Sequence, residues 1–422
     1  MIDARHAALE ALAKILRRRL SLDDALDVSG LEERDRAFAR LLLATTLRRL
    51  GQIDALIAHC LAHPLPAKAV IAQDILRIGV AQLLFLDVAA HAAVDTAVEM
   101  ARTAGLSAHV KLVNALLRRL SRDGRTLVEE QDAAKLNTPA WLWESWNATY
   151  GEPICRAIAH AHLTEAPLDI SCTDDATVWA DRLEAEILST GSLRRAAGGA
   201  ISQLPGYEEG AWWVQDAAAA LPARLLGDIT GRRIADLCAA PGGKTAQLAA
   251  AGAHVVAIDR AAKRLERLQD NLGRLHLSAE VVVADAVSWR PATPLDGVLL
   301  DAPCSATGTL RRHPDAAWLK RPEDVAKLTL SQARLLAATV EMVRPGGLIV
   351  YCTCSLQPEE GIAQIETLLS QGAPLRRRPI AAAEVGGMAE LITPSGDLRS
   401  LPCHMTEKGG MDGFFATRLE KI

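Results

Sequence analysis

The feature that most constrains the fold is a regular alternation of apolar runs with helical segments between about residues 230 and 355. In chain order the runs read "RIADLCAA", "HVVAIDR", "AEVVVADA", "LDGVLLDAP" and "GGLIVYCTCS". Helical patterns such as residues 261–275 and 327–343 separate them. Strands that alternate with helices form a parallel, doubly wound sheet, and such sheets bind ligands at the carboxyl ends of their strands. The polar and glycine residues lie at these ends, so we expect the functional site there.

The first third of the chain has the periodicity of helices. One apolar stripe consists of Ile53, Leu56, Ile57, Cys60 and Leu61, which recur at i, i+3, i+4, i+7 and i+8. Further stripes lie in residues 31–50, 69–86, 92–104 and 108–121. We therefore expect residues 1–128 to form an all-α bundle.

Between these regions the texture of the sequence changes. A tryptophan-rich stretch with Trp141, Trp143 and Trp146 is followed by short mixed segments such as "APLDISCT" and "ATVWADRLEAEI". We interpret residues 136–205 as a small α/β module. Residues 206–422 are then left for the doubly wound domain.

Composition limits the class of protein. A chain of 422 residues with 50% hydrophobic and 23% charged residues is typical of a globular protein with two or three domains. It has neither a signal-peptide pattern nor an apolar run of about 18 residues, so we expect a cytoplasmic protein without membrane attachment. Thiols stay reduced in that compartment, and the eight cysteines show no metal-ligand spacing. We expect no disulfide and no metal.

The loop after the first strand, "DLCAAPGGKT", is placed to meet a ligand at a helix N-terminus. It is not a P-loop, because Cys238 stands where that motif needs glycine, and the G-x-G-x-x-G spacing is also absent. Gly242 and Gly243 still allow close approach of the backbone, although they also fit a plain tight turn. Asp259 and Asp285 end the next two strands, where carboxylates can meet ribose and adenine. Each of these residues alone could be an ordinary turn or cap residue, but together they favour a binding site for an adenosine-containing ligand.

Two cysteines lie at neighbouring strand ends. Cys304 follows a proline after the fourth strand, and Cys354 ends the fifth, so both should project over the same crevice. A single cysteine in an apolar strand is usually a packing residue, and we interpret Cys352 in this way. A pair at adjacent strand ends favours chemistry instead.

The motifs carry a resemblance to a known family. "DLCAAPGGKT", "DAPCSATGTLRRHPD" and "TCSLQPEEG", in this order, resemble the RNA cytosine-5 methyltransferases of the Nop2/Sun family, which use S-adenosylmethionine. The N-terminal helices, including "VKLVNALLRRL", resemble the NusB-like domain of its bacterial Sun-type members, which methylate one cytosine of 16S ribosomal RNA. The resemblance implies a NusB-like RNA-binding bundle and a Rossmann-like methyltransferase domain, joined by the small α/β module.

The resemblance also implies roles for individual residues. It makes Cys354 the nucleophile, Cys304 the group for product release, and Asp301 the group that protonates N3 and anchors the base. It assigns the cofactor pocket to Cys238, Ala239, Ala240, Pro241, Gly242, Gly243, Lys244, Asp259, Asp285 and Asp301. Spacing alone leaves the attacking thiol open, because DNA cytosine-5 methyltransferases use the cysteine of the Pro-Cys motif. Amino-group methyltransferases are disfavoured, because "DAPC" has no aromatic residue to stack a base.

The expected partner is 16S ribosomal RNA, bound by a monomer. Residues 1–125 hold 18 Lys and Arg against 14 Asp and Glu, a mild positive excess in a chain with a net charge of −4. Five basic residues could hold phosphates or form a solvated charged face: Lys244, Arg311, Arg312, His313 and Lys320. The alternative function is an RNA-binding assembly or antitermination factor with a vestigial catalytic fold. The two intact cysteines argue against this alternative.

Overall fold

The computed structural model describes residues 3–422, which form two compact units. We call them the helical unit (residues 3–164 together with Leu310–Lys320) and the sheet unit (Glu165–Thr309 and Arg321–Ile422). The chain therefore passes from one unit to the other three times. Each unit is described by itself.

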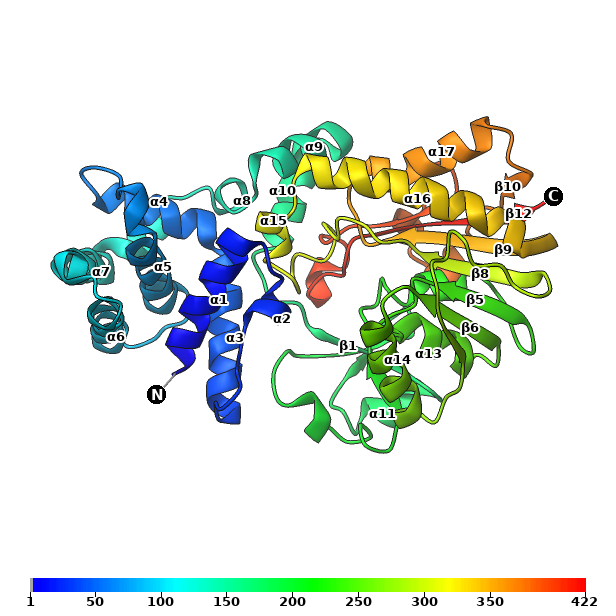
Figure 1. Cartoon of the computed structure of the whole chain (residues 1–422), viewed down its shortest axis with the longest axis horizontal. Coiled ribbons are helices and arrows are strands. Elements are labelled where there is room, and N and C mark those ends of the chain that lie inside the picture. The colour runs from blue at the N-terminus through cyan, green and yellow to red at the C-terminus, as the bar shows by residue number, and fades with distance from the viewer. Residues whose placement is uncertain (1–2) are drawn as a thin grey trace. The chain divides into compact units, whose positions relative to one another are not determined.

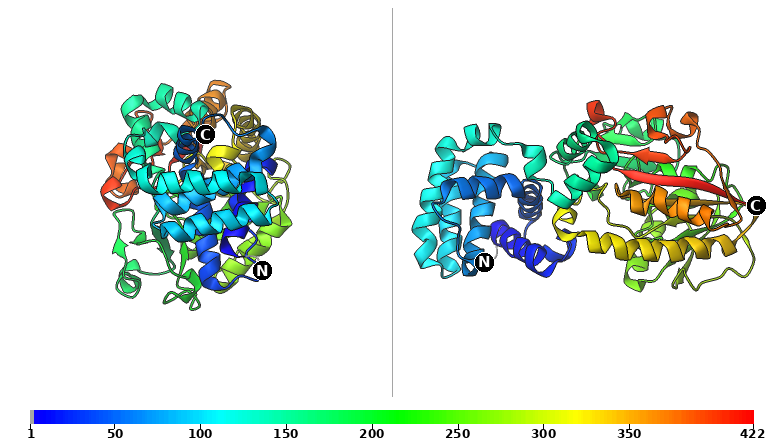
Figure 2. Two further views of the ribbon diagram at one scale, coloured as in Figure 1. Left: turned by 90° about the vertical axis from the view of Figure 1, so that its left-hand side faces the viewer. Right: turned by 90° about the horizontal axis from the view of Figure 1, so that it is seen from above.

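The helical unit is a bundle of amphipathic helices (Figure 1). The bounds of the helices are α1 Ala4–Arg18, α2 Leu22–Ala25, α3 Glu33–Arg48, α4 Leu50–Cys60, η1 Ala67–Ala69, α5 Val70–Phe85, α6 Ala90–Thr103, α7 Ser107–Glu129, α8 Ala133–Leu136, α9 Ala140–Tyr150, α10 Glu152–Ala161 and α15 Ala316–Leu319. The apolar stripes form its core: Ile53, Leu56 and Ile57 of α4 are at most 1% exposed. Helices α6 and α7 lie side by side (Figure 2). The expected all-α N-terminal bundle is confirmed.

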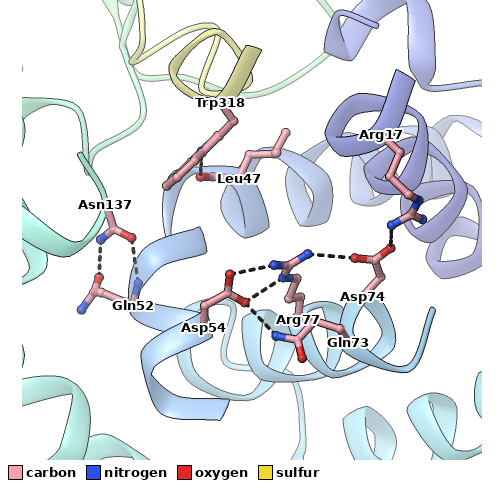
Figure 3. A network of polar contacts seen from close by, with 9 residues as sticks. All are labelled: Arg17, Leu47, Gln52, Asp54, Gln73, Asp74, Arg77, Asn137 and Trp318. Carbon is pink, nitrogen blue, oxygen red and sulfur yellow. Dashed lines mark hydrogen bonds and ion pairs between the residues drawn. The ribbon is translucent and has the colours of Figure 1, made fainter. Parts of the chain in front are cut away.

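Charged residues are also buried in this bundle (Figure 3). Asp74 on α5 is 1% exposed and accepts hydrogen bonds from Arg17 at 2.7 Å and Arg77 at 3.0 Å. Arg77 also binds both carboxylate oxygens of Asp54 at 2.7 Å. Each carboxylate thus faces a guanidinium, which is the condition under which burial of charge is tolerated.

A short segment from far along the sequence completes the helical unit. Residues Leu310–Lys320, which contain α15, pack with the N-terminal helices. Trp318 Nε1 donates to the carbonyl of Leu47 at the end of α3, at 2.9 Å (Figure 3). Asp315 Oδ2 accepts from the backbone N–H of Leu22 at 3.0 Å. The segment thus supplies hydrogen-bond partners to the start of α2 and the end of α3.

The sheet unit begins with a small antiparallel sheet in the order β2-β3-β1-β4. Its strands are β1 Leu168–Cys172, β2 Glu186–Ile187, β3 Leu193–Arg195 and β4 Trp212–Val214, with α11 Ala176–Ala180 and η2 Ile201–Gln203 between them. The Trp-rich stretch before it is helical and lies in the helical unit. Strands β1, β2 and β3 lie within the expected 136–205 module, whereas residues 136–164 are helical apart from short turns and β4 extends the small sheet to Val214.

The larger sheet of this unit has the strand order β10-β12-β9-β8-β5-β6-β7. Its strands are β5 Arg233–Leu237, β6 His254–Asp259, β7 Glu280–Val283, β8 Leu295–Asp301, β9 Val343–Thr353, β10 Leu375–Arg377, β11 Leu398–Ser400 and β12 Phe414–Lys421. Strands β9, β8, β5, β6 and β7 are parallel, as expected, whereas β10, β11 and β12 add antiparallel pairing. The doubly wound fold is confirmed, with a mixed sheet.

Helices of the sheet unit accompany this sheet (Figure 1). They are α12 Leu221–Arg224, α13 Gly243–Ala250, α14 Ala262–Arg274, α16 Pro322–Met342 and α17 Ile362–Ser370, with the short turns η3 Pro358–Glu360, η4 Ala382–Val385, η5 Ala389–Leu391 and η6 Thr406–Lys408. Helix α16 runs along the strands β8 and β9 (Figure 2). The chain builds outward from β5 to β6 and β7, and then returns to add β8 and β9 on the other side. This reversal places the ends of β5 and β8 at the topological switch point, where such sheets bind ligands.

Candidate active site

The loop after β5 has a conformation that depends on glycine. Gly242 has a φ of 104°, in the region that L side chains rarely adopt. A Cβ atom there would also lie 2.8 Å from Cγ of Leu268. Gly243 instead begins α13, and a Cβ atom there would make only an ordinary contact with the Trp213 ring, at 3.9 Å. The close approach anticipated for both glycines is thus required at Gly242.

A buried aspartate lies near the end of the strand that precedes this loop. Asp236 is fully buried at the end of β5, and its Oδ2 accepts from Thr245 Oγ1 at 2.6 Å. Its Oδ1 has no hydrogen-bond partner within residues 3–422. Burial raises the pKa of Asp236 to about 7. Sequence reasoning quoted this residue within the motif but gave it no role.

The carboxylate of Asp259 also contacts the backbone of this loop. It is 4% exposed, and its Oδ1 accepts from the backbone N–H of Ala261 at 2.9 Å. Its Oδ2 lies 3.4 Å from the backbone nitrogen of Ala240 and 3.4 Å from Nη2 of Arg264. Asp285 lies two residues beyond the end of β7 and is exposed, and its Oδ1 accepts from the N–H of Val287 at 2.9 Å. Asp259 is therefore the last residue of β6, and Asp285 lies just beyond the end of β7.

Lys244 and Asp301 form an ion pair at the switch point. Lys244 Nζ donates to Asp301 Oδ2 at 2.7 Å, and the lysine side chain is only 11% exposed. Burial opposes the charge of Lys244, but Asp301 and the neighbouring Cys352 and Cys354 outweigh burial, so the pKa of Lys244 lies above its ordinary value. Cys352 is buried in the core as expected, and its Sγ also donates to Asp301 Oδ1 at 3.5 Å. Lys244 of α13 and Cys352 of β9 thus share the carboxylate of Asp301.

The two candidate reactive thiols are neighbours. Cys304 Sγ lies 3.4 Å from Cys354 Sγ, although the residues are 50 positions apart in the chain. The hydrogen bond with Cys354 and burial raise the pKa of the Cys304 thiol well above its ordinary value, and the charge of Glu360 adds to the effect. The electrostatics differ across the pair, because an anion acts on Cys304 whereas the ammonium of Lys244 interacts with Cys354.

Sequence reasoning missed the polar cluster behind these thiols. Glu360 is fully buried and accepts hydrogen bonds from the residues that follow the two cysteines, Ser305 and Ser355. The "PEE" sequence contains no signal that separates a buried glutamate from the exposed Glu359 beside it. Only the pairing of distant loops reveals this role.

The structure does not gather the predicted phosphate-binding residues into one exposed surface. Arg311 is 1% exposed and lies in the segment that packs within the helical unit. Lys244 is occupied with Asp301. Neither side chain is placed as an exposed phosphate contact, because the fold buries both. His313 and Lys320 belong to the same inserted segment as Arg311.

Other classes of site receive no support from residues 3–422. No group of three or more His, Cys, Asp or Glu residues in that range is arranged to hold a metal ion. All eight cysteines are free. Among the helices of the described range, none is long and apolar enough to cross a membrane.

The doubly wound fold, the glycine loop and the carboxylates at its strand ends define an S-adenosylmethionine-dependent methyltransferase. Two family models match the chain: "16S rRNA methyltransferase RsmB/F" over residues 223–420 and "NusB family" over residues 2–122. The chain belongs to the RsmB/F family of 16S ribosomal RNA methyltransferases.

Curated relatives match over the whole length. The chain is 35% identical to ribosomal RNA small subunit methyltransferase B of Shewanella oneidensis, a match that covers 100% of this chain and 99% of that protein. It is 36% identical to the protein of the same name from Pseudomonas putida, with the same two shares covered.

Solved structures share the fold. The crystal structure of PH0851 has a TM-score of 0.74 at 22% identity and covers 99% of this chain and 98% of its own. The structure of NSun6 from Pyrococcus horikoshii with SFG has a TM-score of 0.56 at 18% identity and covers 67% of this chain and 98% of its own. At these identities the likeness concerns the fold.

Proposed function

We propose that this methyltransferase modifies C5 of one cytosine in 16S ribosomal RNA through a covalent bond between Cys354 and C6 of the base. The observation that carries the proposal is the pair of thiols, 3.4 Å apart, at strand ends beside the Lys244–Asp301 ion pair. Cytosine C5 is a weak nucleophile, so it needs activation before it can accept a methyl group. A thiol is suited to this task because its thiolate attacks readily and also leaves readily.

In the first step the Cys354 thiolate forms a bond to C6. The electrons of the C5–C6 double bond shift to C4–C5, and those of C4–N3 move to N3, which takes up a proton. Asp301 is the proposed proton donor to N3 and the anchor of the base. Lys244 stands directly behind this carboxyl group at 2.7 Å, so it can return a proton to Asp301.

The later steps reverse the addition. C5 of the enamine formed in the first step would then take the methyl group that bound S-adenosylmethionine supplies, and the thioether of the cofactor would be the leaving group. The electrons on N3 re-form the C4–N3 double bond, and the N3 proton returns to Asp301. The proton on C5 must then leave, its electrons re-form the C5–C6 double bond, and the Cys354–C6 bond breaks. We assign Cys304 to this release step, since its thiol lies against Cys354 and its raised pKa disfavours a competing thiolate.

The cofactor pocket that we propose comprises Cys238 to Lys244 with Asp259, Asp285 and Asp301. Two observations support the fit of an adenosine ligand with a charged amino-acid end. The backbone of the loop can approach a ligand at Gly242, and the buried Oδ1 of Asp236 has no partner within the described chain. An orphaned acceptor below a ligand loop fits a site that a donor completes.

We also propose that the protein acts as a monomer in the cytoplasm. Its helical unit is the part that we expect to bind the RNA. Helix α7 carries exposed basic side chains at positions 111, 118, 122 and 125, which lie on one face of the helix. Such a stripe can contact phosphates, and binding should then weaken with salt. In the full chain, exchange of Arg118 and Arg122 for Ala should weaken 16S RNA binding; unchanged affinity would remove α7 from the RNA surface.

The function is tested with labelled S-adenosylmethionine, unmodified 16S RNA and three proteins: the wild type, Cys354→Ala and Cys304→Ala. We expect 5-methylcytosine by bisulfite sequencing from the wild type and no product or adduct from Cys354→Ala. Cys304→Ala should methylate once and remain attached to RNA on a denaturing gel. Exchanged phenotypes would make Cys304 the nucleophile. No transfer by the wild type would favour a non-catalytic RNA-binding factor.

A further inference from the structure

Glu360 connects the two loops that carry the thiols. It is 0% exposed and ends the turn η3, a few residues after β9. Its Oε1 accepts from the backbone N–H of Ser305 at 2.9 Å, and its Oε2 accepts from the hydroxyl of Ser355 at 2.6 Å. The hydroxyl of Ser305 also bonds to Oε2. One carboxylate therefore holds the residue that follows Cys304 and the residue that follows Cys354.

The carboxylate is itself fixed from two further directions. Gln332 on α16 donates to Glu360 Oε1 at 3.0 Å and to the carbonyl of Pro303 at 2.9 Å. The backbone carbonyl of Glu360 accepts from the Tyr351 hydroxyl at 2.8 Å and from Thr353 Oγ1 at 3.2 Å. Because these partners lie on a long helix and a central strand, Glu360 has little freedom to move.

The serine hydroxyls also contact each other. Ser305 Oγ lies 3.0 Å from Ser355 Oγ, and the backbone N–H of Gly308 donates to the carbonyl of Cys354 at 2.9 Å. The two loops would lose their common acceptor without Glu360. The four buried groups that donate to the carboxylate would then compete for other partners, at a cost in free energy for each one left unsatisfied.

We propose that Glu360 is a positioning residue, which holds Cys304 and Cys354 at the short separation that the release step requires. The inference rests on the proposed two-thiol reaction and deepens it. Glu360 touches no reacting atom in this scheme. It acts through Ser305 and Ser355, one residue away from each sulfur.

The charge of Glu360 adds a second effect in the same direction. It raises the pKa of Cys304, after the larger effects of the Cys354 hydrogen bond and burial. A protonated Cys304 can donate to Cys354 and does not compete for C6. Position and charge thus assign different tasks to two chemically identical groups.

The test compares Glu360→Gln with Glu359→Gln, a matched change at the exposed neighbouring residue. Diamide removes one hydrogen from each thiol, forms the Cys304–Cys354 disulfide, and becomes the hydrazine. The rate is followed by mass spectrometry of the linked peptide, without RNA or cofactor. We expect the disulfide to form at least about 10-fold more slowly in Glu360→Gln, and at the wild-type rate in Glu359→Gln.

Catalysis provides the second measurement. We expect kcat of Glu360→Gln to fall on the order of 100-fold, the effect of a misplacement of about 1 Å, with KM for RNA nearly unchanged. Alkylation of Cys304 by iodoacetamide at pH 8 should become faster, since the nearby negative charge is gone. Wild-type rates of crosslinking, alkylation and turnover, even with a lowered Tm, would reduce Glu360 to a structural residue.

Two further outcomes distinguish failure of this inference from failure of the proposed function. If Glu360→Gln does not fold, Ser355→Ala removes one bond to the carboxylate and should show the same slower crosslinking; wild-type crosslinking there would overturn the proposal. If the wild type makes no 5-methylcytosine while crosslinking still depends on Glu360, the proposed function fails but the positioning of the thiols stands.

Discussion

Both units bury charged side chains, but the network in the helical bundle and the candidate active site of the sheet unit surround them differently. In the helical unit Asp74 lies between two guanidinium groups, and Arg77 in turn engages Asp54 (Figure 3). In the candidate active site Asp301 is also paired, with Lys244, but sulfur atoms lie near both Asp301 and Glu360, and Asp236 has an oxygen without a partner in the described chain. In the first arrangement each buried charge has a partner of opposite sign. In the second, thiols and a carboxylate oxygen are left that a bound ligand could contact.

The comparison teaches that a buried charge does not mark an active site by itself. A structural network pairs each charge with its opposite and stabilises the bundle only while every member is present. A reactive site instead keeps a nucleophile within reach of charges that differ in sign on its two sides. Four substitutions test this difference.

The largest effect is expected for Asp74→Ala in the helical unit. It leaves Arg77 and Arg17 facing an empty acceptor position, and removal of one partner from a buried pair costs about 3 kcal/mol or more. Thermal unfolding should show the loss, while the affinity for S-adenosylmethionine stays unchanged. Asp23→Ala is the matched control, because its ion pair with Arg40 is more than half exposed and worth less than about 1 kcal/mol. Equal effects of the two changes would contradict the closed network.

Lys244→Gln should show the reverse pattern in the sheet unit. It removes the cation beside Asp301 and Cys354, so the rate of methyl transfer should fall on the order of 100-fold, as for loss of a preorganised donor at a reacting group. Single-turnover kinetics would measure the fall, with the exposed Lys263→Gln as control. A normal rate would mean that the ion pair is structural, as in the helical unit.

Asp259→Ala should weaken S-adenosylmethionine binding by about 1.5 to 3 kcal/mol, the range for hydrogen bonds that involve a charged group. The same change loosens the loop, because Asp259 accepts from the backbone of Ala261. Calorimetric titration measures the affinity, and Asp270→Ala, an exposed change on α14, provides the control. Unchanged affinity would exclude Asp259 from the pocket.

Asp236→Asn should change the dependence of stability on pH. Its folded pKa of about 7 lies above the ordinary value of 3.8, so the folded state keeps the proton to higher pH than the unfolded chain. The stability from this group is fully present below about pH 4 and is lost as the pH rises through 7. The variant cannot lose that proton, so its decline from pH 5 to 7 should be smaller, by at most about 1.4 kcal/mol per pH unit. Urea denaturation measures the free energy of unfolding at each pH. The same pH dependence in the wild type and the variant would contradict the raised pKa of Asp236.

Much of the fold could be predicted because its signals are local. The stripe of Ile53, Leu56 and Ile57 predicts a helix, and the apolar runs that alternate with helices predict the parallel strands. The antiparallel addition could not be read in this way. Strand β12 pairs with β9 across more than 60 residues of intervening chain, and neither sequence specifies that partner.

The site divides along the same line. Asp259, Cys304 and Cys354 could be found because polar residues at strand ends converge at one edge of a parallel sheet. Glu360 and Asp236 could not, since their importance comes from burial against loops that are distant in sequence. Arg311 was misjudged for the same reason: a basic residue beside a catalytic motif suggests a phosphate contact, but the fold buries it among helices.

The excursion of Leu310–Lys320 into the helical unit makes both units discontinuous in the gene. A recombination event that replaced the first 164 codons would leave α15 packed against foreign helices to which its side chains are not fitted. The excursion begins six residues after Cys304, so a compensating change on the α15 side of this packing would fall close to that cysteine in the chain. We therefore expect sequence change in the helical unit to constrain sequence change in the segment that follows Cys304.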